Sequence, residues 1–315
     1  KKPLTKEESA KVIEAAIRYE LKNPTGELTK ADYEKVTQLG LHRSHLTEIP
    51  KELEKLNQLK TLWLSDNQLT DVTGLEKLDQ LKKLYLQNNQ LTELPKGLEK
   101  LDQLTYLHLS DNQLADVTGL EKLNQLKTLW LSDNQLTEVP KGLEKLNQLT
   151  WLYLQNNKLT EVPNLENLDQ LRVLFLHNNK LTEVPNLEKL DQLTYLHLSD
   201  NQLADVTGLE KLNQLKTLYL SSNKLTEVPK GLEKLDQLTF LELGDNQLTE
   251  VPNLEKLDQL TYLSLSSNQL TEVPKGLENL DQLTSLSLSR NQLTSVTGLE
   301  KLDQLKKLYL YNNQL

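Results

Sequence analysis

The chain has 315 residues, more than one ordinary globular core needs, and its formal net charge is −9. This acidity argues against a nucleic-acid backbone as partner, and no apolar run reaches the length of a membrane-spanning helix. Because the sequence has no cysteine, disulfides, thiolate metal sites and a cysteine nucleophile are excluded.

The first 35 residues predict two helices. Thr5 and Glu8 have the spacing of a capping box, and apolar residues then recur at helical spacing, so we expect a helix from about Lys6 to Leu21. A second, shorter helix is expected between Thr29 and Lys35. These helices would cover the first strand after residue 35, which would otherwise be a bare apolar edge.

From Leu59 onward one pattern returns. The stretch LKTLWLSDNQL has the form L-x-x-L-x-L-x-x-N-x-L, and this form occurs twelve times at steps of 22 or 23 residues. The alternation predicts a short strand, with leucines such as Leu62 inward and Trp63 and Ser65 facing solvent. Successive strands run the same way, which predicts one parallel sheet. The asparagines of the pattern are Asn67, Asn89, Asn112, Asn134, Asn157, Asn179, Asn201, Asn223, Asn246, Asn268, Asn291 and Asn313.

The segments between the strands come in three forms. They read DVTGLEKL, EVPKGLEKL and EVPNLENL, and the form with Pro-Lys-Gly is one residue longer, which accounts for every step of 23. These segments are too short for a long helix, so we expect extended or 3₁₀ turns. Residues 36–41 are a degenerate first strand, with Ser44 in place of the asparagine.

A fixed period of this length with this pattern is typical of leucine-rich repeats, and the sequence resembles that family from about Val36 to Leu315. The 22-residue forms and the helical start resemble bacterial internalin-type proteins, and the Val-Pro forms resemble another common bacterial class. The resemblance implies an α/β solenoid, a leucine-rich-repeat horseshoe or arc. Its parallel β-sheet would line the concave face, with short extended or 3₁₀ turns on the convex face. Residues 1–35 would be the helical cap and 36–315 the solenoid, with one degenerate repeat, eleven full repeats and a terminal partial one. It also implies that the Asn67 amide and its equivalents bond the backbone of adjacent turns, as an asparagine ladder.

The strand from Leu305 to Leu310 is the last, and the sequence stops at Leu315 within a repeat. Either a C-terminal cap has been removed or another molecule covers this edge, so self-association there is one expectation.

The outward strand positions vary between repeats and carry most of the aromatic residues. All three tryptophans, both phenylalanines and eight of the ten tyrosines lie there. Aromatic residues on a rigid concave face resemble interface anchors, although they also suit exposed strand positions without any partner. Because an exposed apolar patch of this extent usually marks an interaction site, we predict binding. The candidate partner-binding residues are Trp63, Tyr85, Tyr106, His108, Trp130, Trp151, Tyr153, Val173, Phe175, His177, Tyr195, His197, Tyr219, Phe240 and Tyr262.

Catalytic and metal chemistry have weaker support. His108, Ser110 and Asp111 lie within four residues, but an open sheet supplies neither burial nor an oxyanion hole for a hydrolytic triad. His177 and His197 are expected on adjacent strands, yet nothing completes a zinc site. We therefore expect no enzyme activity, no metal and no cofactor. An acidic row at the strand ends is interpreted as solvated turn residues that would otherwise favour basic partners; it comprises Asp66, Asp111, Asp133, Asp200 and Asp245.

The leading hypothesis is a non-enzymatic module that binds a protein or peptide on its concave face. The alternatives are an engineered or structural scaffold with no natural ligand, and a carbohydrate-binding surface. Residues 104–125 and 193–214 are identical, which indicates recent duplication or a consensus-built array, whereas the irregular alternation of the return segments favours a bacterial origin. The sequence has no methionine, which indicates that a leader or tag is missing from it. A leader would place the protein outside the cell or on its surface; otherwise it would be cytoplasmic.

Overall fold

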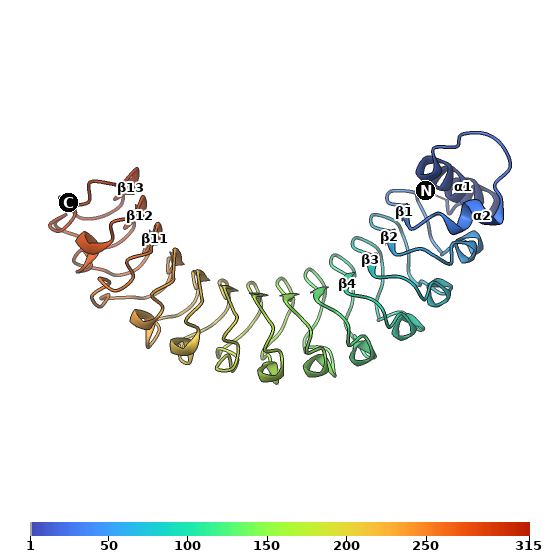
Figure 1. The fold of residues 1–315 in the computed structure, drawn as a ribbon. Helices are drawn as coiled ribbons and strands as arrows, with labels where there is room; N and C mark the ends of the chain where they lie inside the picture. Colours follow the sequence, from blue (N-terminus) through green and yellow to red (C-terminus); the bar gives the residue numbers. More distant parts are fainter. Residues whose placement is uncertain (1) are drawn as a thin grey trace. The chain divides into compact units, whose positions relative to one another are not determined.

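The computed structural model describes residues 2–315. The chain divides into two compact units, one ending at Asn157 and the other beginning at Lys158. Figure 1 shows the helices at the start of the first unit, followed by successive strands in chain order.

The N-terminal cap consists of α1 (Lys6–Leu21) and α2 (Lys30–Glu34), as the sequence predicts. The Thr5 hydroxyl accepts from the Glu8 amide while the Glu8 carboxylate accepts from the Thr5 amide, a complete capping box. The buried side chains of Ile13 and Ile17 belong to the face of α1 that packs on β1 (Gln38–Gly40). The cap therefore covers the first strand with apolar side chains.

Each repeat contributes one three-residue strand, and every described pair of neighbours is parallel. The first unit also contains β2 (Thr61–Trp63), β3 (Lys83–Tyr85), β4 (Tyr106–His108), β5 (Thr128–Trp130) and β6 (Trp151–Tyr153). The second contains β7 (Val173–Phe175), β8 (Tyr195–His197), β9 (Thr217–Tyr219), β10 (Phe240–Glu242), β11 (Tyr262–Ser264), β12 (Ser285–Ser287) and β13 (Lys307–Tyr309). Equivalent residues are in register, as where Leu62 lies opposite Leu84.

The core of each unit is a continuous stack of leucines. Leu62, Leu84 and Leu107 occupy equivalent positions on successive strands and are fully buried. Full burial of one such side chain contributes about 2 kcal/mol. In the last repeat the equivalent residue, Leu308, is 42 % exposed, because no described strand lies on its other side.

The expected asparagine ladder is present. The Asn134 amide nitrogen donates to the carbonyl oxygens of Leu109, Leu131 and Ser132, each at 3.1 Å, and its oxygen accepts from the Leu114 amide at 3.0 Å. One buried side chain thus satisfies backbone groups of its own repeat and of the preceding one, where a turning chain would leave them unpaired.

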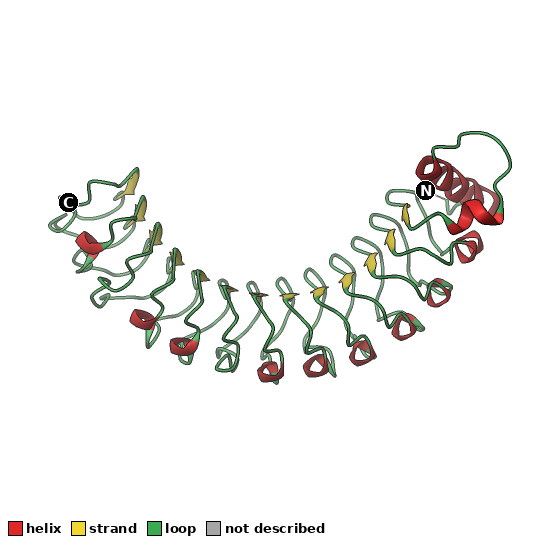
Figure 2. Ribbon diagram, in the orientation of Figure 1, coloured by secondary structure: helices red, strands yellow, loops and turns green. Residues whose placement is uncertain are grey.

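Most return segments in the described part of the chain contain a short 3₁₀ helix and the others none, in line with the predicted extended or 3₁₀ turns. Within residues 2–315 there are nine, and Figure 2 shows them on the side of each unit opposite the strands, which line its concave side. A glycine with positive φ precedes most of them, and at Gly276 (φ 88°) a Cβ atom would lie 2.6 Å from the Glu255 amide nitrogen. In residues 2–315 no helix combines the length and apolar character needed to cross a bilayer.

Candidate binding face

The fifteen candidate residues lie on the strand side of the two units, where the sequence places them. Most lie within the strands, and His177 follows β7. The expectation that they project freely into solvent is wrong for nearly all of them. Only Trp151, at 43 %, is exposed, and the others are half-buried.

The half-burial arises because the rings stack on one another. In the first unit Trp130 lies between His108, with ring centroids 4.7 Å apart, and Tyr153, at 3.6 Å, and all three rings are nearly parallel. Trp63 stacks on Tyr85 at 5.7 Å. Neighbouring strands are about 4.8 Å apart, so rings at equivalent positions meet face to face.

The second unit has its own stack. His197 lies between His177, at 3.7 Å between centroids, and Tyr219, at 4.2 Å. Phe240 and Tyr262 are parallel at 4.2 Å. The ring faces in both stacks are therefore largely turned toward each other.

The edges of these rings carry polar atoms. Burial raises the pKa of Tyr106 to about 12, with a smaller contribution from Tyr85, so its hydroxyl stays protonated well into the alkaline range. Burial likewise raises the pKa of Tyr262 to about 12, and its hydroxyl donates to Glu242 at 3.1 Å. The face therefore combines apolar ring area with tyrosine hydroxyls, whereas the indole nitrogen of Trp130 is buried within the stack.

The third outward position of each repeat is predicted to face solvent, and this is wrong for several of the serines that occupy it. Ser65 is buried, and Ser110 is only 2 % exposed. The Ser110 and Ser132 hydroxyls are 2.5 Å apart and bond each other across neighbouring strands. A small residue here lies beneath the flanking larger side chains instead of standing above the sheet.

The histidine–serine–aspartate cluster does not assemble a triad. The Ser110 amide donates to His108 Nδ1 at 3.3 Å, while its hydroxyl pairs with Ser132. Contrary to the expectation of an unburied site, burial lowers the pKa of His108 to about 4. His108 is thus a neutral member of the ring stack. The second copy has the same contact, from the Ser199 amide to His197 Nδ1 at 3.4 Å.

The backbone conformation explains why aspartates recur after the strands. Asp66, Asp111 and Asp133 follow the strands with φ of 55–57°, the left-handed region that aspartate and asparagine tolerate better than most residues. Burial raises the pKa of Asp111, and the charges of Asp133 and Asp66 raise it further. These carboxylates therefore concentrate negative charge along one edge of the face.

The two histidines expected on adjacent strands do lie together. The His177 and His197 rings are stacked, and among residues 2–315 no group of three or more histidine and acidic side chains is placed to hold an ion.

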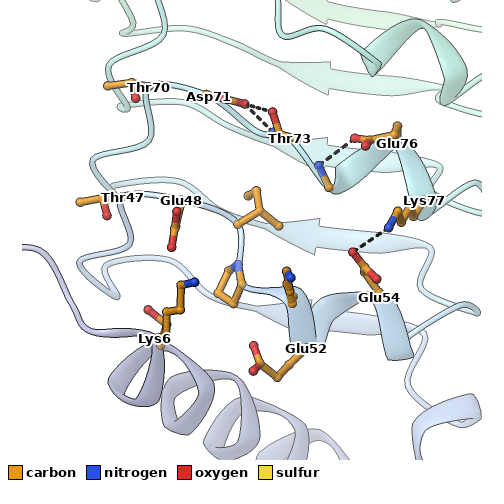
Figure 3. Close-up of a pocket in the computed structure, with 15 residues that line it drawn as sticks. Lys6, Thr47, Glu48, Glu52, Glu54, Thr70, Asp71, Thr73, Glu76 and Lys77 are labelled. Atoms are coloured by element: carbon orange, nitrogen blue, oxygen red, sulfur yellow. Dashed lines mark hydrogen bonds and ion pairs between the residues drawn. The ribbon is translucent and has the colours of Figure 1, made fainter.

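A separate cavity of about 490 Å³ lies between the start of α1 and the return segments of the first repeats (Figure 3). Three of its five carboxylates are already held. Asp71 accepts from the Thr73 hydroxyl at 2.6 Å, Glu76 accepts from a backbone amide, and Glu54 pairs with Lys77 at 3.0 Å. We assign this cavity to the junction between cap and repeats.

Comparison with known proteins agrees with the fold. Three models, described as leucine-rich repeat, leucine-rich repeats in two copies and leucine-rich repeat region, match residues 34–91, overlapping stretches within 79–189, and 197–315. The crystal structure of internalin C2 from Listeria monocytogenes is 31 % identical, covering 67 % of this chain and 92 % of that one at a TM-score of 0.63. The chain belongs to the leucine-rich-repeat family. An internalin (inlF) from the same organism is 29 % identical over 96 % of this leucine-rich-repeat chain and 89 % of its own, at a TM-score of 0.90.

These likenesses support the internalin-like, bacterial character expected of the sequence. A more distant likeness is the leucine-rich-repeat ectodomain of the receptor kinase GASSHO1/SCHENGEN3 from Arabidopsis thaliana, solved in complex with Casparian strip integrity factor 2. It is 26 % identical over 85 % of this chain and 43 % of that one, at a TM-score of 0.53. No curated protein sequence matches the chain. The matched models describe repeats and no catalytic domain.

Proposed function

We propose that this leucine-rich-repeat protein is a non-enzymatic module that binds a protein or peptide on the aromatic strand face. The observation that carries the proposal is the stack around Trp130, in which neighbouring rings hold one another in fixed positions on the strand face. Rings held in place lose little conformational entropy on binding, and tyrosine and tryptophan are the residues that most often anchor interfaces. The plant ectodomain complex supports binding by a related fold.

The same stack disfavours the carbohydrate alternative. Sugar rings pack on open aromatic faces, whereas both faces of Trp130 are covered by His108 and Tyr153. Trp151 is the exception, since it is exposed, and it is the residue on which a sugar would be detected. A scaffold without a ligand would gain only the stability of the ring pairs, because the leucine stack and the asparagine ladder already hold the repeats together.

The test is selection of peptides from a random library on the immobilised protein. Selected peptides should lose at least tenfold in affinity for Trp151→Ala and for Trp130→Ala. Tyr19→Ala is the matched control, since Tyr19 is 82 % exposed on α1 and away from the strand face. Peptides that bind all three variants alike would refute the proposal, and a glycan-array signal lost only in Trp151→Ala would favour sugar.

We also propose that the open edge at β13 associates with a second copy of the chain. Leu308 and Leu315 are exposed there, at positions where the leucines of earlier repeats are buried. Sedimentation should give a concentration-dependent dimer that Leu308→Lys abolishes. A monomer at all concentrations would contradict this second proposal and leave the first untouched.

A further inference from the structure

The strand face of the first unit has opposite charges along its two edges. Immediately before the strands, Lys60, Lys82 and Lys127 are exposed, and Lys83 lies within β3 itself. Three residues after the ends of β2, β4 and β5 come Asp66, Asp111 and Asp133. The stacked rings lie between these edges.

Most of these charges have no ion-pair partner within the described residues, although Asp66 and Asp133 accept hydrogen bonds from the Asn88 and Asn156 amides. None of the four lysines takes part in an ion pair among the described residues, and of the three aspartates only Asp66 does, with Arg43 at 4.0 Å. Mutual repulsion along the acidic edge is evident at Asp111, whose carboxyl pKa is raised by burial and by its two neighbours. A partner that placed acidic groups beside the lysines and basic groups beside the aspartates would pair the charges of both edges.

The spacing selects the conformation of such a partner. Lys60 and Asp66 flank β2, while Lys127 and Asp133 flank β5, three strand steps away. Three steps are about 14 Å. In an extended peptide, residues i and i+4 point to the same side and lie about 13 Å apart. In a helix, residues i and i+8 lie on one face about 12 Å apart along the axis, which fits less well.

We propose that the strand face of residues 2–157 selects an extended peptide segment lying across β2–β5, with acidic side chains toward the lysine edge and basic side chains toward the aspartate edge. Because successive side chains of an extended peptide alternate in direction, the recognised pattern is acidic-basic-x-x-acidic-basic. Its two middle residues lie over the rings. This inference rests on the proposed function and names the chemistry of the partner.

The probe is a pair of blocked peptides of identical composition. The matched peptide is Glu-Lys-Thr-Val-Glu-Lys, and the control is Glu-Lys-Thr-Val-Lys-Glu, in which the last two residues are exchanged so that each side carries mixed charge. Binding is followed by tryptophan fluorescence, which reports on this face alone because all three tryptophans, Trp63, Trp130 and Trp151, lie on it. The matched peptide should bind at least threefold more tightly, and the difference should vanish in 0.5 M salt.

The matched variants neutralise two carboxylates at a time. Asp66→Asn with Asp133→Asn should remove the preference for the matched peptide, and the fold should survive because Asn88 and Asn156 occupy equivalent positions with the same positive φ. Asp79→Asn with Asp102→Asn changes the net charge equally at positions that precede β3 and β4, outside the aspartate edge, and should leave the preference intact.

The outcomes separate the two claims. Equal binding of both peptides, or binding of neither, overturns the charge pattern. The library selection on Trp130→Ala and Trp151→Ala then decides by itself whether the face binds peptides at all. A preference that persists in the Asp66→Asn, Asp133→Asn variant also overturns the pattern.

Discussion

Replacing Asn201 with alanine is the sharpest test of how the repeats cohere. The Asn201 amide nitrogen donates to the carbonyl oxygens of Leu176, Leu198 and Ser199 at 3.0–3.2 Å, and its oxygen accepts from the Leu181 amide at 3.0 Å. Each of the three carbonyls also accepts a bond from another donor. The Leu181 N–H, fully buried, is therefore the only group left without a partner.

The number of hydrogen bonds lost sets the expected decrease in the free energy of unfolding. An orphaned buried N–H costs about 1–3 kcal/mol, and three weakened carbonyl interactions add about half as much again, so the Asn201→Ala variant should lose about 3 kcal/mol. The measurement is urea unfolding combined with hydrogen exchange at the Leu181 amide, which should exchange faster than its neighbours. Asn313→Ala, in the half-buried last repeat, should cost less. A loss below about 1 kcal/mol in Asn201→Ala would refute the reasoning.

Two further predictions concern backbone strain and protonation. In thermal or urea unfolding, Gly276→Ala should destabilise the protein by at least about 1 kcal/mol more than Gly208→Ala. Both glycines have φ near 85°, but of the two only Gly276 has backbone atoms within 3 Å of the added Cβ. Equal losses of stability would show that the positive φ alone determines the cost. As the pH falls below the ordinary histidine value of 6.5, the unfolded chain takes up protons before folded His108 and His197, whose pKa values burial lowers to about 4 and about 3. Stability is therefore lost from pH 6.5 down to about 4 for His108 and about 3 for His197. The His108→Gln, His197→Gln variant should lose less stability than the parent between pH 7 and pH 5, and identical losses would contradict this.

Much of the fold can be predicted from local sequence. The capping box at Thr5 and the helical spacing after it define α1 with the bounds the structure has. The pattern that occurs twelve times predicts the strands. One asparagine per repeat, such as Asn134, predicts the asparagine ladder, because a buried side-chain amide needs hydrogen-bond partners for both its oxygen and its nitrogen. These features depend on residues close in sequence or on an exact repeat.

The environment of the binding face is harder to predict. The pattern places Trp130 and Ser110 on the same side of the sheet, but their exposure depends on which side chains lie beside them, 22 or 23 residues away. Trp130 is covered by its stacking partners, and Ser110 is buried beside larger side chains. Comparing equivalent positions along successive repeats would have found the stacking, since aromatic residues succeed one another there. The sequence could also have predicted the left-handed backbone at Asp66, because aspartate, asparagine or serine occupies that position in most repeats.

Ring stacking across strands has a consequence for how the surface can change over time. Substituting Trp130 alters the support of both His108 and Tyr153, so the effect of a second change at either one depends on the first. Rings several strands away have no such dependence. A new binding specificity should therefore require several replacements at adjacent ring positions. Duplication of a repeat would pass such a group of residues on together.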